Sequence, residues 1–439
     1  MNDSWFAQAG RIVILVGSCM LFSVQARELS LQDAFDLAVQ HSHQLKKAKA
    51  EREAYESALR AAKAARLPTL SAETFAFYKD EVPSLGITIT PDRTFSREIG
   101  THENYQTDLR ISVPLFTGGK ISGSIKAASA QLDLYRALED CTLEQLLYQT
   151  RIAYLMLYRA ERLQEVAQAS QDRTLIILKD IRAALEAGTA DSTDLLEVNL
   201  ANNEAFLKLE QAQSARRSAE IKLRTLLNLP ATESINVVDK PPPPVGRAVY
   251  YTFISKPELR ATKAAISYNR ALMTLARSTY LPTIYTYAGY SYGKPNIDWF
   301  NKTWMDYFSI GAQLSWSLNV GMKERLEERR ARYLYQAAQR ELDNLTERFE
   351  REALLAREQV ALARHQYSTA KLRRKTAADN YRLAIRMHRQ GALSSNRLLE
   401  IETKLSEAEA ALETAVVDYH LAESAYFYAL GSEQLKEGF

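Results

Sequence analysis

The sequence has few cysteines, no excess of charge of one sign, and no long apolar segment after its first residues. It contains 2 cysteines in 439 residues, 56 basic against 53 acidic side chains, and 46% hydrophobic residues. The near balance of charge argues against the basic stripe of a nucleic-acid-binding protein, and the hydrophobic content excludes wholesale disorder. No later window holds the ~18 apolar residues of a membrane helix. Any membrane contact must therefore be made by strands.

Residues 1–26 are predicted to be a secretory signal peptide. Arg11 precedes an apolar stretch from Ile12 to Val24, and Ala26 ends a small-residue cleavage site. A single-span anchor is the alternative, but the stretch is too short to cross about 30 Å of hydrocarbon. Lipidation of Cys19 is a further alternative. If the signal is removed, Cys141 is the only remaining cysteine, which excludes an intramolecular disulfide.

The motifs of enzymes are also missing. The 6 histidines show no HExxH or other metal-ligand spacing, apart from the neighbouring His41 and His43 at a predicted helix end. The stretch FTGGK lacks the spacing of a phosphate-binding loop, and no GxSxG occurs. We therefore expect no enzymatic activity, no cofactor and no metal site.

What the sequence does contain is an internal repeat. The stretch VPLFTGGK at 113–120 recurs as WSLNVGMK at 316–323, and residues 187–228 align without gaps on residues 390–431 at the same separation. Such self-similarity indicates a duplicated structural unit. The sequence thus predicts two tandem repeats, 27–240 and 256–431, joined by a proline-rich linker at 241–255 and followed by a tail at 432–439.

Each repeat is predicted to contain a helix, a strand, a loop, a second strand, a very long helix and a return helix. The first helix is expected from Leu31 to Arg66, because Pro68 disfavours helical geometry in the residue before it. The other elements are expected at about 69–78, 104–115, 119–186 and 191–228 in the first repeat, and at about 283–292, 307–318, 322–389 and 394–431 in the second. The long helices would each span about 100 Å. The return helices show coiled-coil spacing; an ordinary amphipathic bundle explains that spacing but not the lengths.

The predicted strands alternate between apolar and polar residues. In the second strand, one face carries Tyr105, Thr107, Leu109, Ile111 and Val113, and the other carries Gln106, Asp108, Arg110 and Ser112. A buried soluble sandwich shows similar alternation, but very long helices and aromatic hairpin tips in a secreted chain favour membrane strands. Four strands leave unpaired edges that hydrocarbon cannot satisfy. We therefore expect a barrel closed between chains, and three chains would give twelve strands and a lumen.

Together these segments resemble the TolC-type outer membrane efflux proteins, or outer membrane factors, of Gram-negative bacteria. The resemblance rests on residues 29–51, on LPTL at 67–70, on VPLFTGGK and on the segment from Gly188 to the DLLE at 194–197. It runs from about Leu29 to Gly431. It implies a mainly α fold with membrane β-strands, in which a homotrimer forms a twelve-stranded β-barrel in the outer membrane, continued by a helical barrel across the periplasm.

The resemblance also implies partners and entrance residues. A periplasmic adaptor (membrane fusion) protein is expected to dock at the turns of Gly188, Thr189, Gly391 and Ala392, although helix capping alone would explain the glycines. The acidic candidates for narrowing the entrance and binding cations are Asp191, Asp194, Glu197 and Glu400. The family often has an acidic residue at the position of Arg397, so we expect an Asp194–Arg397 contact that acts as a latch.

The predicted function is passive export through the outer membrane, from the adaptor and an inner membrane transporter to the exterior, in tripartite efflux or type I secretion. The strand residues expected to face the lumen, for solvation or for selectivity, are Gln106, Asp108, Arg110, Gln313 and Ser315. Drugs, metal ions, siderophores and polypeptides would pass through similar tubes. A periplasmic coiled-coil scaffold without a pore is the alternative, but it leaves the duplicated strands unexplained.

Overall fold

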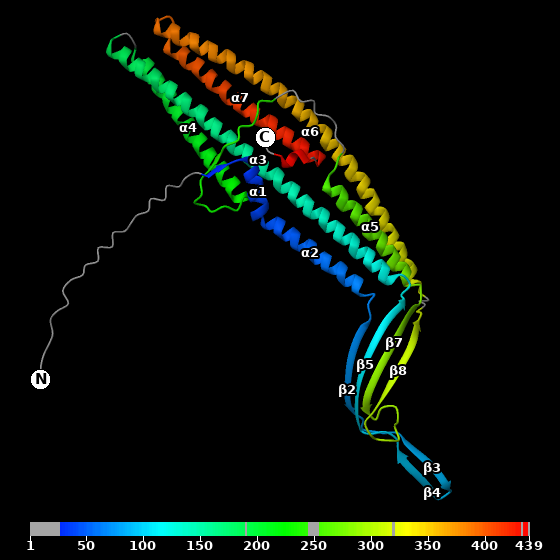
Figure 1. The fold of residues 1–439 in the computed structure, drawn as a ribbon. Coiled ribbons are helices and arrows are strands. Elements are labelled where there is room, and N and C mark those ends of the chain that lie inside the picture. Colours follow the sequence, from blue (N-terminus) through cyan, green and yellow to red (C-terminus); the bar gives the residue numbers. More distant parts are fainter. Residues whose placement is uncertain (1–26, 189–190, 245–253, 318–320, 432, 438–439) are drawn as a thin grey trace, which may run out of the picture.

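The protein consists of an elongated helical body with a twisted β-sheet at one end, as the computed structural model shows (Figure 1). The structure describes residues 27–188, 191–244, 254–317, 321–431 and 433–437. The predicted signal peptide with Cys19, most of the linker, and Thr189 lie outside the described residues. The predicted duplication is confirmed, because both halves contribute two strands to one sheet and a pair of long helices to the body.

The helical body is built mainly from two long helices and their return helices. Helix α3 (Lys120–Glu186) and helix α6 (Lys323–Arg389) each contain 67 residues, which corresponds to about 100 Å. Their return helices are α4 (Ser192–Leu226) and α7 (Ser395–Leu430), and each pair runs together to a far end in Figure 1. Helix α5 (Pro257–Ser278) packs beside α3 and α6 nearer the sheet.

The predicted continuous helix from Leu31 to Arg66 is wrong. The structure has two helices there, α1 (Leu31–His41) and α2 (His43–Ala64). Ser42 interrupts them with an extended ψ of 118°, and its hydroxyl accepts a hydrogen bond from the Leu45 N–H at 3.2 Å. A serine that caps the following helix takes an extended backbone conformation, so the preceding helix cannot continue through it.

The main sheet joins the two repeats. Strands β2 (Thr69–Tyr78), β5 (Glu103–Phe116), β7 (Thr283–Lys294) and β8 (Met305–Ser315) are antiparallel in the order β2-β5-β7-β8. Strand β8 ends at Ser315, before the predicted end at 318, and the Trp316 indole donates a hydrogen bond to the Tyr280 carbonyl at 3.0 Å. Within the described chain, β2 and β8 each pair on one side only.

Two strand pairs were not predicted. The expected loop at 79–103 contains a hairpin of β3 (Ser84–Thr90) and β4 (Arg93–Glu98). Strand β1 (Arg27–Leu29) pairs in parallel with β6 (Ile235–Val237) and ties the start of the first repeat to its end. The expected tail includes a short 3-10 helix, η1 (Glu433–Lys436), whose Leu435 is buried.

The largest buried cluster lies where α1, α3, α4 and the β1–β6 pair meet. Phe35, Leu223 and Ile235 are among its buried members. At its centre the Tyr154 hydroxyl donates to the Leu29 carbonyl at 3.0 Å and accepts from the Asp239 N–H at 3.1 Å. No helix in the described residues is long and apolar enough to cross a membrane.

Candidate functional site

The register of the main sheet brings the five strand residues expected to face a lumen onto one face. Asp108 lies opposite Glu73 of β2 and Ser291 of β7, and Arg110 lies opposite Ser71 and Gly289, while the β7–β8 pairing places Gln313 and Ser315 on the same side. Directly opposed residues of an antiparallel pair share a face. The Gln106 amide donates to both carboxylate oxygens of Asp108, at 3.0 and 2.9 Å. This face of the sheet is polar and internally hydrogen-bonded.

The opposite face of the sheet is apolar and exposed. Its large side chains include Leu70, Leu109, Ile111, Phe308, Ile310 and Leu314. Ile310 is 78% exposed and Leu70 is 72% exposed. A contiguous apolar surface of this kind is rare in a soluble monomer and indicates a protein partner or lipid.

Aromatic side chains gather at the end of the sheet far from the helices. The Trp304 ring stacks near Tyr292, with ring centroids 5.2 Å apart, and near Tyr105 at 5.8 Å. Trp299 and Phe300, in the turn between β7 and β8, are more than half exposed. Aromatic belts of this type mark the interface between hydrocarbon and water in membrane barrels.

The far ends of the long helices close in glycine turns. Gly188 and Gly391 have φ of 75° and 71°, in the left-handed region that favours glycine. The Gly391 N–H donates to the His388 carbonyl and the Ala392 N–H to the Met387 carbonyl, both at 2.9 Å, which is the hydrogen-bond pattern of a Schellman motif. A Cβ added at either glycine would meet open space. The left-handed backbone therefore explains why glycine occurs at both turns, and the open space around them leaves the tips of the helices accessible.

The acidic candidates at the tips have local partners. Asp191 is the N-cap residue of α4, and the Thr193 hydroxyl donates to its carboxylate at 2.8 Å, which lowers the pKa of the Asp191 carboxyl. Lys404 donates to Glu400 at 2.6 Å and Arg397 also pairs with Glu400, so the pKa of Glu400 is lowered.

The expected latch is not formed within the described chain. Arg397 pairs with Glu400, one turn along its own helix, rather than with Asp194. The i,i+3 spacing brings these two side chains together whatever the neighbouring helix does. Asp194 is half-buried and Glu197 is exposed in the first turns of α4.

A buried ionic cluster, which sequence analysis missed, connects α3 to α7. Arg173 of α3 donates to Glu402 at 3.0 Å, to Ser406 at 2.9 Å and to Glu409 at 3.1 Å, all on α7. Ser170 adds a hydrogen bond to Glu402 at 2.9 Å, and Glu402 is only 4% exposed. No sequence signal distinguishes Arg173 from the other basic residues on the long helices. We call these five residues the α3–α7 clamp.

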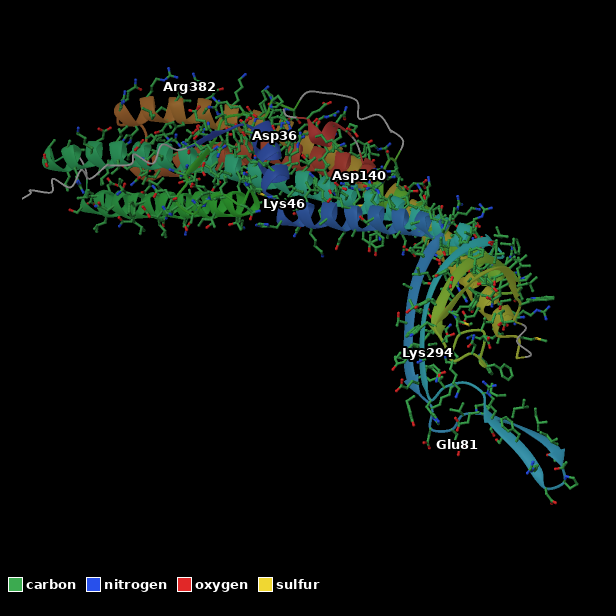
Figure 2. All side chains as sticks on the ribbon, turned by 60° about the horizontal axis from the view of Figure 1, so that its bottom comes forward. Asp36, Lys46, Glu81, Asp140, Lys294 and Arg382 are labelled. Atoms are coloured by element: carbon green, nitrogen blue, oxygen red, sulfur yellow. The ribbon has the colours of Figure 1, made fainter. Side chains whose placement is uncertain are left out.

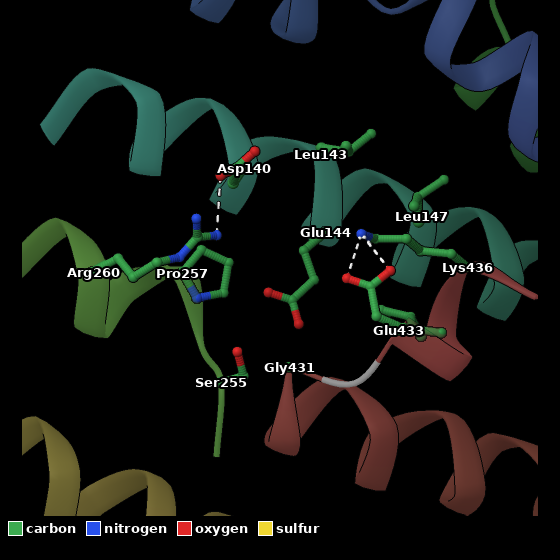
Figure 3. Close-up of a pocket in the computed structure, with 11 residues that line it drawn as sticks. Asp140, Leu143, Glu144, Leu147, Ser255, Pro257, Arg260, Gly431, Glu433 and Lys436 are labelled. Carbon is green, nitrogen blue, oxygen red and sulfur yellow. Dashed lines mark hydrogen bonds and ion pairs between the residues drawn. The ribbon is translucent and has the colours of Figure 1, made fainter. Parts of the chain in front are cut away.

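A polar pocket lies where the second repeat begins and α7 ends. Figure 3 shows the Glu144 side chain of α3 directed into this cavity of about 260 Å³, between Ser255, Pro257 and Gly431. Lys256 is buried, with its Nζ 3.5 Å from Glu144 Oε1 and 3.5 Å from the Tyr428 ring centroid. Burial raises the pKa of Glu144 to about 7, although Lys256 opposes the shift. The pocket thus holds a carboxyl that titrates near neutral pH.

An apolar groove runs between α3 and α4. It encloses about 880 Å³ and is lined largely by small and aliphatic side chains, including Ile152, Met156 and Leu163 from α3 and Ala212 and Ala215 from α4. Such a groove fits another helix better than a polar ligand.

Comparison with known proteins now decides the family. The model of the outer membrane efflux protein family matches residues 34–229 and 252–432, which is most of both repeats. The chain belongs to the outer membrane efflux protein family. It is thus an outer membrane channel protein that extends into the periplasm, and it is not an enzyme, as predicted.

Solved outer membrane efflux channels have the same fold. The CmeC outer membrane channel of Campylobacter jejuni is 14% identical, with a TM-score of 0.73 over 91% of this chain and 85% of that chain. VceC of Vibrio cholerae is 15% identical, with a TM-score of 0.74 over 92% and 96%. The open-state MtrE channel of Neisseria gonorrhoeae is 17% identical, with a TM-score of 0.73 over 92% and 89%. No curated protein matches the chain.

Proposed function

We propose that three copies of this chain form the outer membrane exit duct of a tripartite efflux or type I secretion system. The observation that supports this most strongly is the main sheet, which has one polar face, one exposed apolar face and two edges that no other described strand pairs with. In hydrocarbon, unpaired strand edges cost several kcal/mol for each backbone group. The edge of β2 in one chain therefore pairs with the edge of β8 in the next.

Three copies are the smallest assembly that leaves a passage. Two copies would form an eight-stranded barrel, whose interior is filled by side chains, whereas three form a twelve-stranded barrel with a lumen. The apolar faces then contact outer membrane lipid, and Gln106, Asp108, Arg110, Gln313 and Ser315 line the lumen. These polar side chains hydrate the passage and need not select a substrate.

The helical bodies continue the duct through the periplasm. The groove between α3 and α4 offers an apolar surface to a neighbouring helix, and the turns at Gly188–Thr189 and Gly391–Ala392 form the far entrance, where a periplasmic adaptor docks above an inner membrane transporter. Asp191, Asp194, Glu197 and Glu400 carry negative charge at that entrance, partly balanced by Arg397. Threefold repetition of these carboxylates attracts cations to the entrance.

Edge-to-edge crosslinking tests the assembly. With Cys141→Ser as background, Ser71→Cys on β2 and Ser309→Cys on β8 should crosslink with a short bifunctional thiol reagent into a ladder that ends at three chains. The matched control places both cysteines on the register partners Thr107 and Tyr292 of the inner strands, where only crosslinks within a chain are expected. The same trimers should resist heat in detergent and raise planar-bilayer conductance. A soluble monomer without conductance would instead favour the scaffold without a pore.

A further inference from the structure

The β3–β4 hairpin extends beyond the end of the main sheet that lies far from the helices (Figure 1), and Figure 2 shows Glu81 at its base. All of its strand residues are exposed, including Ile87 at 53%, Ile89 at 73% and Phe95 at 60%. A two-stranded ribbon is marginally stable in water by itself, and one with exposed large apolar side chains needs a surface to cover them.

The register separates the hairpin into two unlike faces. Ile87 lies opposite Phe95 and Leu85 lies opposite Arg97, so apolar and cationic side chains share one face. Arg93 continues that face toward the turn by alternation along β4. The register shifts between Thr88 and Thr90, so that Ile89 and Thr90 together lie opposite Arg93. The opposite face carries Ser84, Gly86, Thr88, Thr94, Ser96 and Glu98. The first face, with Leu85, Ile87, Ile89, Phe95, Arg93 and Arg97, is called the arginine face below.

The arginine face carries unbalanced positive charge. Neither Arg93 nor Arg97 forms an ion pair with another described residue, and no acidic residue lies on this face. Glu98 belongs to the hydroxyl-rich face, where its carboxylate is 4.0 Å from Lys302. A covering partner must therefore be both apolar and anionic.

We propose that the arginine face lies on an anionic lipid surface, at the outer leaflet beside the barrel. Guanidinium groups bind phosphate oxygens in a bidentate manner, and aliphatic and aromatic side chains of an amphipathic segment enter the boundary between headgroups and acyl chains. The base of the hairpin adjoins the aromatic end of the sheet, where the Gly100 N–H donates to the Trp299 carbonyl at 2.9 Å, and aromatic belts of barrels lie at the membrane surface. The inference rests on the membrane crossing proposed above.

A second copy of the hairpin is the less suitable partner. Three arginine faces packed together around the barrel axis would gather the arginines of every copy with no acid between them. Like charges placed opposite one another across strands are destabilising. An anionic lipid surface neutralises the same arginines instead.

The test compares neighbouring residues on the two faces. The full chain, with Cys141→Ser as background, is placed in lipid nanodiscs with an environment-sensitive fluorophore at Ile87→Cys or, as the matched control, at Thr88→Cys. Quenching by lipids brominated on their acyl chains is measured in phosphatidylcholine discs and in discs that also contain phosphatidylglycerol. We expect quenching at residue 87 but not at residue 88, and more of it in the anionic discs. Arg93→Gln and Arg97→Gln should each lower the ratio of docked to free hairpin about fivefold in anionic discs.

Other results would overturn the proposal. Equal quenching at residues 87 and 88, or none at residue 87 in anionic discs, would show that the arginine face does not bind lipid. Excimer fluorescence between pyrene labels at residue 87 would show that the hairpins cover one another. Heat-resistant trimers and conductance are recorded from the same samples. A conducting trimer with an unquenched hairpin removes only this inference, whereas a sample without trimers or conductance removes the proposed duct.

Discussion

Arg173 of α3 and the buried Glu402 of α7 form an ion pair, with 3.0 Å between Nε and Oε1, that joins the long helix of one repeat to the return helix of the other. The pair lies in the α3–α7 clamp, in which Ser170 and Ser406 also hydrogen-bond to Glu402. One oxygen of the Glu402 carboxylate, Oε1, thus accepts hydrogen bonds from both helices. This arrangement holds the two repeats at a fixed spacing in the part of the body that leads to the entrance.

Breaking the clamp should destabilise the protein. Glu402→Leu leaves Arg173 without its most buried partner and is expected to cost about 3 kcal/mol of unfolding free energy, measured by denaturant unfolding in detergent. Because α3 and α7 then lose a polar restraint on their spacing, conductance should rise as well. The double variant Arg173→Met with Glu402→Leu should recover part of the loss.

An exposed ion pair on α6 provides the control. Arg382, which Figure 2 labels on α6, pairs with Asp379 one turn away, and both side chains are more than half exposed. Arg382→Gln should change the unfolding free energy by less than about 1 kcal/mol. Equal effects of Glu402→Leu and Arg382→Gln would contradict the assigned importance of the clamp.

Glu144 should make stability depend on pH between about 4.5 and 7. Its pKa rises from 4.5 to about 7 on folding, so the folded chain holds this proton more tightly than the unfolded chain. The group therefore stabilises the folded state below pH 4.5, and that contribution is lost as the pH rises through 7. We expect Glu144→Gln to remove about 1 to 2 kcal/mol of this pH dependence in thermal unfolding at several pH values.

Glu433 is the matched control for Glu144. It lines the same pocket, but its side chain is 84% exposed and pairs with Lys436 (Figure 3). Glu433→Gln should leave the dependence of stability on pH between 4.5 and 7 as it is in the wild-type chain. If Glu144→Gln also leaves the pH dependence of stability unchanged, another group than Glu144 causes it.

Gly118 should tolerate no side chain. It has a φ of 59° at the joint between β5 and α3, and an added Cβ would lie 2.7 Å from Leu281 Cβ and 2.8 Å from the Ser278 carbonyl oxygen. Gly118→Ala therefore combines backbone strain of about 1 kcal/mol with a steric cost of about 1 to 3 kcal/mol. Gly188→Ala has similar backbone strain but meets open space. A comparable melting temperature for the two variants would show that this joint can relax.

Entrance carboxylates should control cation block. Asp194→Asn combined with Glu197→Gln removes two negative charges per chain from the tip of α4, and block of conductance by divalent cations added on the periplasmic side should weaken because the local potential falls. Glu407→Gln, farther along α7 and paired with Arg373, serves as the control. Unchanged block in the double variant would place the narrow part of the passage elsewhere. Arg397→Glu tests a latch between chains, which predicts a change in conductance.

Periodicity predicted those parts of the fold that depend on neighbours along the chain. Alternation in Gln106, Asp108 and Arg110 was enough to assign the polar face, since a strand places alternate residues on opposite sides. The glycine turns followed from helix-ending chemistry, and positive φ at Gly188 and Gly391 confirms it. The same alternation was present in Leu85, Ile87 and Ile89 of β3, but residues 79–103 were expected to be a loop between the two strands of the first repeat.

Contacts between helices that are far apart in the sequence could not be predicted from periodicity. The partner of Arg173 is 229 residues away, and on a charged helix surface nothing in the sequence selects Glu402 over its neighbours. The expected Asp194–Arg397 contact is absent within the described chain for a related reason, because Glu400 lies one turn along the same helix and pairs with Arg397. Ser42 shows a third limit: one side-chain hydrogen bond divides a helix whose composition is otherwise continuous.

The order β2-β5-β7-β8 also bears on how such a protein originated. The central pairing of the sheet, β5 with β7, joins a strand of the first repeat to a strand of the second, and in the proposed trimer β8 and β2 of adjacent chains make the same kind of junction. Each junction between repeats in the proposed barrel therefore pairs the second strand of one repeat with the first strand of the other, whether the two repeats belong to one chain or to two. A half-length chain with one hairpin and one helix pair would have all the surfaces needed to close the same wall as a ring of six.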